Sequence, residues 1–175
     1  MHPMRKKLKQ QFPRLPLIKD GVAQMEPFKG FKDYDYLFEL TKKYRYNKTP
    51  REKVEMDLIK YLRAIWKGFD QKTHTPLGVV FITYLPWMGY SFDAYFDHEL
   101  AYTIDPKANY SMRAGHMTLA YFFTFMHNHI FTTHDIRNRA ATIASKKLGF
   151  QVINEYDTSH GKFVLMLNKG EKYGR

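Results

Sequence analysis

The chain has 175 residues, which suits one domain with a full hydrophobic core and leaves little room for a second. Hydrophobic residues make up 44% and aromatic residues 17%, enough apolar surface to offset chain entropy and exclude wholesale disorder. The absence of Cys excludes disulfides, thiolate catalysis and Cys-based metal centres. No segment has the apolar length of a signal peptide core or a membrane span, so we expect a soluble, cytoplasmic protein.

The formal net charge of +11 is unevenly distributed. Residues 1–50 hold 12 Lys and Arg against 5 Asp and Glu, whereas residues 51–175 hold 16 against 12. The basic region could bind nucleic acid by releasing counterions, or it could be a solvated tail that aids solubility.

Four prolines and little periodicity in residues 1–30 predict an extended or partly ordered arm, which Leu15, Leu17 and Ile18 could pin to the domain. The sequence thus divides into a basic arm (1–30), a folded domain (31–169) and a short tail (170–175).

Two helices are expected at the start of the domain. Residues 31–44 place apolar side chains on one helical face, with lysines near the end. The capping box Thr49-Pro-Arg-Glu52 begins a second helix. An apolar stripe from Val54 to Trp66 extends this second helix to Gly68.

Three strands follow, at residues 78–85, 90–96 and 98–104, and all of them are rich in β-branched and aromatic side chains. A long, largely apolar helix is expected over residues 112–129, and a short strand over residues 130–133.

The best-defined local pattern runs from Asn138 to Phe150. Asn138 suits the N-cap of a helix, and Gly149 suits the left-handed position after its end. Residues 150–156 and 161–167 then predict an antiparallel hairpin.

This pattern, an Asn-x-x-Ala helix ending in Leu-Gly-Phe, resembles the last conserved helix of the GNAT acyltransferase superfamily. The expected order of elements over about residues 31–168 also resembles GNAT proteins. The resemblance implies an α/β (α+β) GNAT-like acyltransferase fold, with a central mixed, mostly antiparallel sheet flanked by helices.

The resemblance also implies a site for acetyl-coenzyme A or another acyl-coenzyme A. In the family, a loop before the central helix holds the pyrophosphate with backbone N–H groups, which suit phosphate physically. The matching stretch departs from the family pattern, because Arg113 lies two rather than three positions before Gly115 and Met117 replaces a small residue. The stretch could hold phosphate, with help from Lys107, or merely cap a helix. The cofactor-binding candidates are Tyr110, Arg113, Ala114, Gly115, His116 and Asn138.

The middle strands of such proteins often supply a general base for the acceptor amine. Glu99 is the first choice here and Asp97 the second, with surface ion pairing as the alternative for either carboxylate. Seven residues after the conserved Asn, the family often has a Tyr that protonates the leaving thiolate, and this chain has Ser145. Tyr156 or Tyr121 could substitute for the missing Tyr.

Four histidines invite a metal hypothesis, but residues two apart on a helix do not share a face, so we expect no metal site. They are His116, His127, His129 and His134.

We therefore expect an acyl-coenzyme A dependent N-acyltransferase with an unidentified amine acceptor and no membrane partner. The alternative is a divergent GNAT-like protein of bacteriophage type, either a catalytically inactive virion component or a protein that binds nucleic acid or modifies DNA. It would lie in the host cytoplasm or the virion. A plain nucleic-acid-binding module is a third option. In both alternatives the basic residues within 1–50 would bind the nucleic acid.

Overall fold

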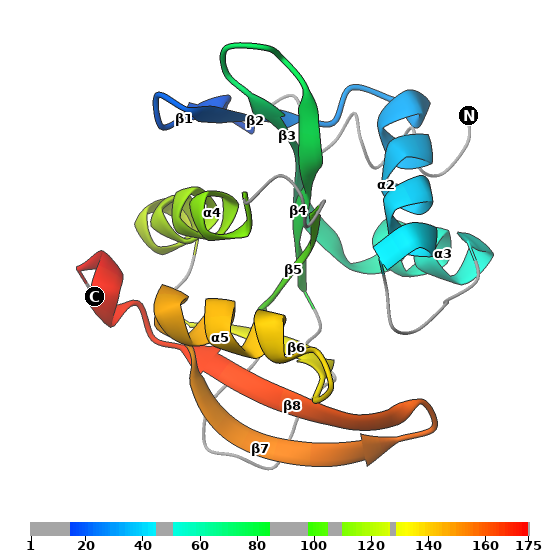
Figure 1. Cartoon of the computed structure of the whole chain (residues 1–175), viewed down its shortest axis with the longest axis vertical. Helices are drawn as coiled ribbons and strands as arrows, with labels where there is room; N and C mark the ends of the chain where they lie inside the picture. Colours follow the sequence, from blue (N-terminus) through cyan, green and yellow to red (C-terminus); the bar gives the residue numbers. More distant parts are fainter. Residues whose placement is uncertain (1–14, 45–50, 85–97, 105–109, 127–128, 175) are drawn as a thin grey trace.

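A computed structural model describes residues 15–44, 51–84, 98–104, 110–126 and 129–174 (Figure 1). In these residues eight strands form one sheet in the order β1-β2-β3-β4-β5-β6-β8-β7. All neighbouring strands are antiparallel except β5 and β6, which are parallel. The strands are β1 (Ile18–Lys19), β2 (Ala23–Pro27), β3 (Leu62–Asp70), β4 (Pro76–Tyr84), β5 (His98–Ile104), β6 (Ile130–Asp135), β7 (Gln151–Thr158) and β8 (Gly161–Asn168).

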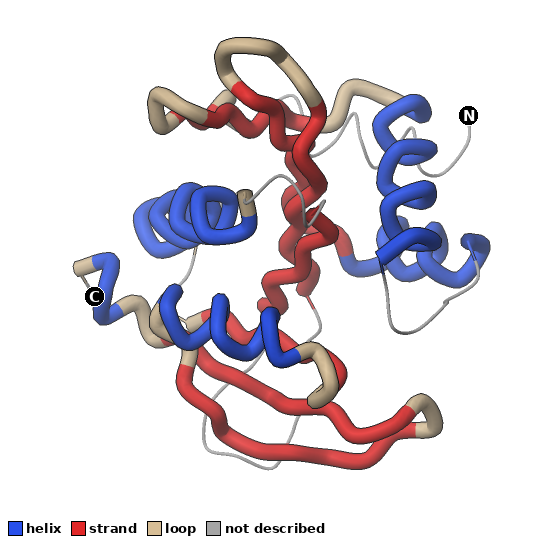
Figure 2. Tube along the Cα trace, in the orientation of Figure 1, coloured by secondary structure: helices blue, strands red, loops and turns tan. Residues whose placement is uncertain are grey.

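Helices cover both faces of the sheet, as Figures 1 and 2 show. One apolar cluster lies between the sheet and α4 and α5, and it includes Phe122 and Leu148. A second cluster lies under α2 and α3, and it includes Leu37 and Leu58. The helices are α2 (Phe31–Tyr44), α3 (Arg51–Tyr61), α4 (Ser111–Phe125), α5 (Arg139–Leu148) and the short 3₁₀ helix η3 (Glu171–Tyr173). This layered, mostly antiparallel arrangement confirms the expected fold class.

Most elements expected from the sequence are present. Helix α2 has the expected bounds, α4 covers most of the expected long helix, and β5, β6 and the β7–β8 hairpin lie where the patterns placed them. The strand expected at residues 90–96 lies outside the described residues, as do Thr49 and Pro50 of the capping box.

The second helix was predicted too long. It ends at Tyr61, and Leu62–Asp70 forms β3, which pairs with β2 on one side and β4 on the other. Because β3 is central and covered on both faces, its apolar residues do not alternate cleanly with polar ones. Such an apolar run has no periodicity that separates a buried strand from a buried helix.

Residues 15–30 were also predicted to be an extended or partly ordered arm, and the structure differs there. Residues 23–27 form β2, which is in register with Trp66 to Asp70 of β3. Met25 is fully buried in the core, and the Trp66 indole Nε1–H donates to the carbonyl oxygen of Pro16 at 3.1 Å. These residues belong to the sheet, because buried side chains fix β2 against β3. The arm assignment remains a prediction for residues 1–14, which lie outside the described residues.

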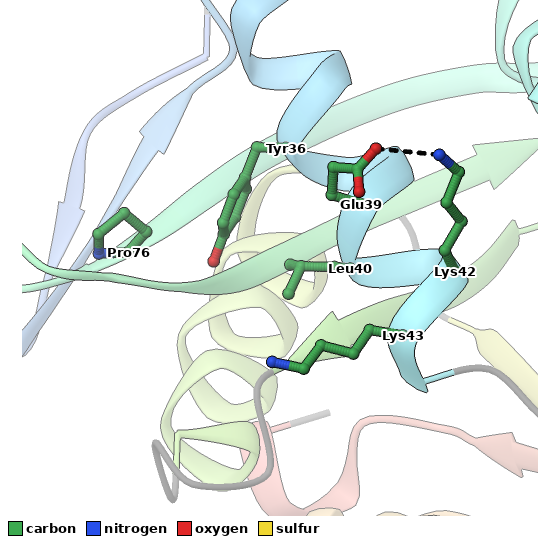
Figure 3. A pocket seen from close by; sticks show the side chains of 6 residues that line it. All are labelled: Tyr36, Glu39, Leu40, Lys42, Lys43 and Pro76. Carbon is green, nitrogen blue, oxygen red and sulfur yellow. Dashed lines mark hydrogen bonds and ion pairs between the residues drawn. The ribbon is translucent and has the colours of Figure 1, made fainter.

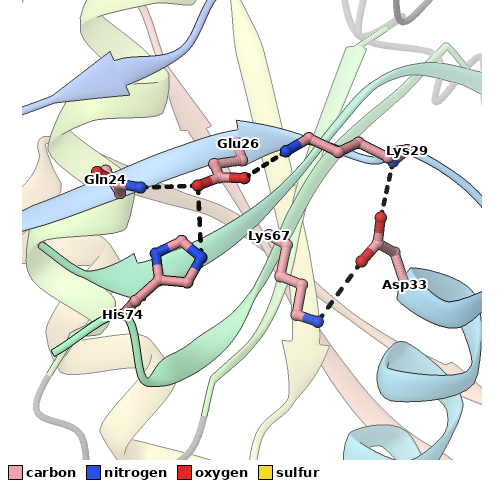
Figure 4. Close-up of polar contacts among 6 residues, drawn as sticks. All are labelled: Gln24, Glu26, Lys29, Asp33, Lys67 and His74. Carbon is pink, nitrogen blue, oxygen red and sulfur yellow. Dashed lines mark hydrogen bonds and ion pairs between the residues drawn. The ribbon is translucent and has the colours of Figure 1, made fainter.

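Polar contacts join β2 to the β3–β4 hairpin and to α2 (Figure 4). Glu26 is ion-paired with Lys29 at 2.9 Å and lies 3.8 Å from His74 Nε2. Asp33 of α2 accepts the backbone N–H of Lys29 and lies 3.5 Å from Lys67 of β3. The basic residues around β2 are therefore partly neutralised by carboxylates.

The C-terminal residues pack against the domain. The Tyr173 ring contacts Phe123 of α4, and its hydroxyl lies 3.0 Å from His116 Nδ1. Lys172 Nζ donates to the Lys147 carbonyl near the end of α5. In the described part of the chain, no helix has the length and apolar character needed to cross a bilayer.

The corner between β6 and α5 is built on Asp135, a buried carboxylate. Its two oxygens accept hydrogen bonds from Arg137 Nε at 2.9 Å and Nη2 at 2.5 Å, and the Arg137 backbone N–H also donates to it. The side-chain hydrogen bonds of Arg137 lower the pKa of Asp135 from its usual value to about 2, against the opposing effect of burial.

This pKa shift predicts an acid-dependent contribution to stability. A carboxylate with a depressed folded-state pKa stabilises the fold above its unfolded pKa of about 3.9, and loses this effect as pH falls through about 2. Arg137→Ala should therefore lower the free energy of unfolding by about 1–2 kcal/mol at neutral pH, a modest amount because Arg137 is exposed.

The difference from the wild type should shrink between about pH 4 and pH 2, as measured by urea unfolding at several pH values. Lys146→Ala, in exposed α5 surface, is the control. A deficit that stays constant down to pH 2 would contradict this account.

Candidate active site

The parallel strands β5 and β6 diverge. Over their described lengths they share one register pair, Glu99 with Phe131. One residue further on, the Thr132 hydroxyl donates to the Leu100 carbonyl at 3.0 Å, so a side chain bridges the widening gap. The two strands thus form a V whose vertex lies near Glu99.

Glu99 lies on the face of the sheet that carries α2 and α3. Side chains alternate along a strand, and Ala101, two residues away, packs against the cluster under these helices. Glu99 Oε1 accepts a hydrogen bond from Thr133 Oγ1 at 2.8 Å across the V. On the other side, Glu99 is in register with Thr83 of β4. Thr83 is 8% exposed, and its buried hydroxyl oxygen has no hydrogen-bond partner among the described residues.

The opposite face of β5 carries Tyr102 toward α5. Tyr102 packs against the cluster under α4 and α5, and its hydroxyl is hydrogen-bonded to the buried hydroxyl of Ser145. Burial raises the pKa of Tyr102, and the Ser145 hydrogen bond partly opposes this shift. Tyr102 is therefore protonated at neutral pH and retains a phenolic proton next to the V.

His134 of β6 lies on the same face as Tyr102. Its Nε2 is 2.8 Å from Thr142 Oγ1 of α5. Burial lowers the pKa of His134, with a smaller opposing effect from Asp135, so the ring is uncharged at neutral pH. The side chains of Tyr102, Ser145 and His134 thus line the α5 side of the V, and none of them carries a formal charge at neutral pH.

Helix α4 begins just after β5, at the open end of the V. The Ala114 N–H donates to the Tyr110 carbonyl at 3.0 Å, so the donors of the first turn are those of residues 111–113. These N–H groups and the helix dipole suit a phosphate. Ala114 and His116 were expected to supply donors, but they lie within the hydrogen-bonded part of the helix.

Arg113 has a partner within the chain. Its Nη1 is 2.8 Å from Asp20 Oδ2 in the β1–β2 turn, and Asp20 also accepts the N–H groups of Val22 and Ala23. A guanidinium has five N–H donors, so this ion pair leaves others available for an anion.

Gly115 and Tyr110 have packing roles in this structure. A Cβ on Gly115 would lie 2.4 Å from Leu148 Cδ1, so Gly115 lets α4 approach α5 closely. The Tyr110 ring lies against Gly68 of β3, where a Cβ would come within 2.4 Å of the ring. Tyr110 is 2% exposed and its hydroxyl oxygen has no partner among the described residues. Its side chain therefore belongs to the core, and its backbone to the helix start.

The remaining candidate site residues that the structure describes do not lie together at the β5–β6 V. Asn138 caps α5, since its Oδ1 accepts the Ala141 N–H at 3.1 Å, and Gly149 has the expected left-handed conformation with φ 100°. Tyr156 lies on the edge strand β7 against Phe163, away from the β5–β6 V. Asp97 and Lys107 lie outside the described residues. Within the described chain, no group of three or more metal-ligand side chains is present.

A hollow of about 590 Å³ opens beside α2 (Figure 3). Helix α2 covers the face of the sheet that carries Glu99, although Glu99 does not line the hollow. Its lining combines the Glu39–Lys42 ion pair, with a distance of 3.1 Å, and the Lys43 side chain. The lining residues are Tyr36, Glu39, Leu40, Lys42, Lys43 and Pro76.

Sequence reasoning missed Thr83 and Tyr102. Both are ordinary strand residues in the sequence, and their importance comes from the side chains that the sheet and α5 bring beside them. Ser145 was singled out as a weak acid, and the structure joins it to a tyrosine from another element.

The chain has the fold of the GNAT acetyltransferases. A GNAT-family acetyltransferase from Bacillus anthracis superposes with a TM-score of 0.65 at 16% identity, covering 89% of this chain and 99% of that one. A probable GNAT-family acetyltransferase from Chromobacterium violaceum has a TM-score of 0.70 at 13% identity, with 92% and 90% covered.

The ribosomal-protein-S5-alanine acetyltransferase from Vibrio fischeri has a TM-score of 0.65 at 12% identity, with 91% and 99% covered. No protein-family model matches the sequence, and a search of curated proteins finds no significant match. At these identities the structural likeness establishes the fold.

Proposed function

We propose that this protein is an acyl-coenzyme A dependent N-acyltransferase. The observation that carries the proposal is the β5–β6 V with a carboxylate, Glu99, at its vertex. The V leaves strand edges for an extended ligand, and the start of α4 lies at its open end. Several structural neighbours of the same fold are acetyltransferases by name, including enzymes for spermidine and for a ribosomal protein.

The residues present fit coenzyme A. The first-turn N–H groups of residues 111–113 suit its phosphates, with Arg113 beside them. The V suits the pantetheine arm, because a strand-like chain between β5 and β6 can use backbone groups that the two strands do not share. Asn138 caps the helix that covers this side.

Acyl-coenzyme A supplies an acyl group activated as a thioester, whose bond to sulfur breaks as the amide bond forms. Glu99 accepts the proton that the amine nitrogen loses when its lone pair forms that bond. Thr133 orients the carboxylate. Tyr102 donates a proton to the departing sulfur from the opposite face, and Ser145 stabilises the phenolate with its hydrogen bond. The acid and the base thus stand on opposite faces of β5.

The acceptor is then expected on the α2 side, where Glu99 and the hollow lie. Nucleic-acid binding by residues 1–50 remains a separate prediction, and residues 1–14 and 45–50 lie outside the described residues.

Calorimetric titration of the full chain with acetyl-coenzyme A tests the proposal. We expect one site with a micromolar Kd, weakened about tenfold by Arg113→Ala, since a charge-assisted hydrogen bond contributes about 1.5–3 kcal/mol. Arg139→Ala, an exposed arginine on α5, should leave the Kd unchanged. Absence of heat at high micromolar ligand would refute the proposed function.

A further inference from the structure

Thr83 carries one of the few buried polar atoms without a partner in the described structure. The others are the hydroxyl oxygens of Tyr34, Thr41, Thr103 and Tyr110. A buried hydroxyl without a hydrogen bond lowers stability, and native proteins leave few such groups. The location of this group is therefore informative.

Thr83 lies beside the carboxylate that the proposed function uses. It is the register partner of Glu99 in the β4–β5 pair. Side chains of directly opposed strand residues lie on the same face, with Cβ atoms about 4.5–5.5 Å apart. The Thr83 hydroxyl and the Glu99 carboxylate thus both belong to the face under α2 and α3, at the vertex of the V.

The two threonines beside Glu99 have different hydrogen bonds. Thr133 on β6 donates to Glu99 Oε1 at 2.8 Å, so its proton is used. The Thr83 hydroxyl on β4 is buried and has no partner in the described structure, so both its donor and its acceptor functions are unsatisfied there. Glu99 therefore lies between one hydroxyl that holds it and one that can hold a ligand.

We propose that Thr83 binds the acceptor amine, with its hydroxyl oxygen accepting a hydrogen bond from the nitrogen whose proton Glu99 removes. This inference rests on the proposed N-acyltransferase function. The amine nitrogen then presents one N–H to Thr83 and one to Glu99, with its lone pair directed toward the acyl carbon.

The valine and serine variants test this role. Val replaces the hydroxyl with a methyl group of similar size, so Thr83→Val should keep the fold and remove an unpartnered polar group. Its melting temperature should equal or exceed that of the wild type. Its KM for the amine should rise about tenfold, the loss of one hydrogen bond to a polar or charged group, with a much smaller change in kcat. Thr83→Ser keeps the hydroxyl and should restore the wild-type KM.

Thr103→Val is the matched control. Thr103 is 6% exposed, also lacks a described partner, and belongs to β5, four residues beyond Glu99. Its replacement should have a similar effect on stability without raising KM. Calorimetric Kd values for acetyl-coenzyme A should be the same in all these variants.

Rates are measured as thiol release from acetyl-coenzyme A with ethylamine, spermidine or a peptide with N-terminal alanine. No release from the wild type with any of the three amines would count against the proposed function itself. A wild-type protein that is active, together with a Thr83→Val variant whose KM for its amine is unchanged, would overturn the role of Thr83 and leave the function standing.

Discussion

Glu99→Gln is expected to lower kcat for acyl transfer by about 10³, because general base catalysis typically contributes about 10²–10⁴. The amide can still accept the Thr133 hydrogen bond that the Glu99 carboxylate accepts at 2.8 Å, so the local packing should persist. What is lost is the ability to take the amine proton at neutral pH. The measurement is the initial rate of thiol release at saturating acetyl-coenzyme A and amine.

The matched control is Glu155→Gln, a strand carboxylate on the exposed edge strand β7. Its rate should equal that of the wild type. The Kd for acetyl-coenzyme A and the melting temperature should change little in either variant. A Glu99→Gln protein with a rate within twofold of the wild type would show that another group accepts the proton.

The second large effect concerns the contact between α4 and α5. Leu148 is fully buried, and its side chain lies against Gly115. Leu148→Ala should destabilise the protein by about 2–5 kcal/mol, through lost transfer free energy and a cavity. Gly115→Ala should cost about 1–3 kcal/mol, because the new Cβ lies 2.4 Å from Leu148 Cδ1, although the better helix propensity of Ala offsets up to about 1 kcal/mol.

The two substitutions should compensate each other in the double variant. Leu148→Ala removes the three atoms nearest to a Cβ at position 115, so this Cβ can fill part of the cavity. Urea unfolding should give a double-variant loss smaller than the sum of the single losses by about 1 kcal/mol or more. Ile143→Ala, an exposed position on the same helix, should change stability by less than about 0.5 kcal/mol. Strict additivity would mean that Gly115 does not limit the approach of the helices.

This cycle also separates two hypotheses for Gly115. The resemblance to GNAT sequences implied that Gly115 belongs to a loop that holds phosphate, whereas the structure shows a glycine that lets two helices approach each other. Both roles require a residue without a side chain, so the presence of glycine at position 115 of the sequence could not distinguish them. Only the position of Leu148, 33 residues further along, shows the packing requirement.

The misassigned segment at residues 62–70 has a similar explanation. Between the second helix and α4, the sequence nevertheless predicted three strands and the described structure has three, because β3 was assigned to a helix and an expected strand at 90–96 lies outside the described residues. Agreement in the order of elements therefore concealed a different assignment of segments. A continuous apolar run can be assigned as a buried strand only when the strands that pair with it on both sides are known.

The sequence by itself determined the elements that local hydrogen bonds define. The Asn138 cap, the left-handed Gly149 and the following hairpin depend on residues within a few positions of one another, and all three were predicted. Tertiary structure alone decided the site. Glu99 meets Thr83 through strand register, Tyr102 meets Ser145 through helix packing, and Arg113 meets Asp20 across 93 residues. These pairs depend on how distant segments pack, which no local pattern encodes.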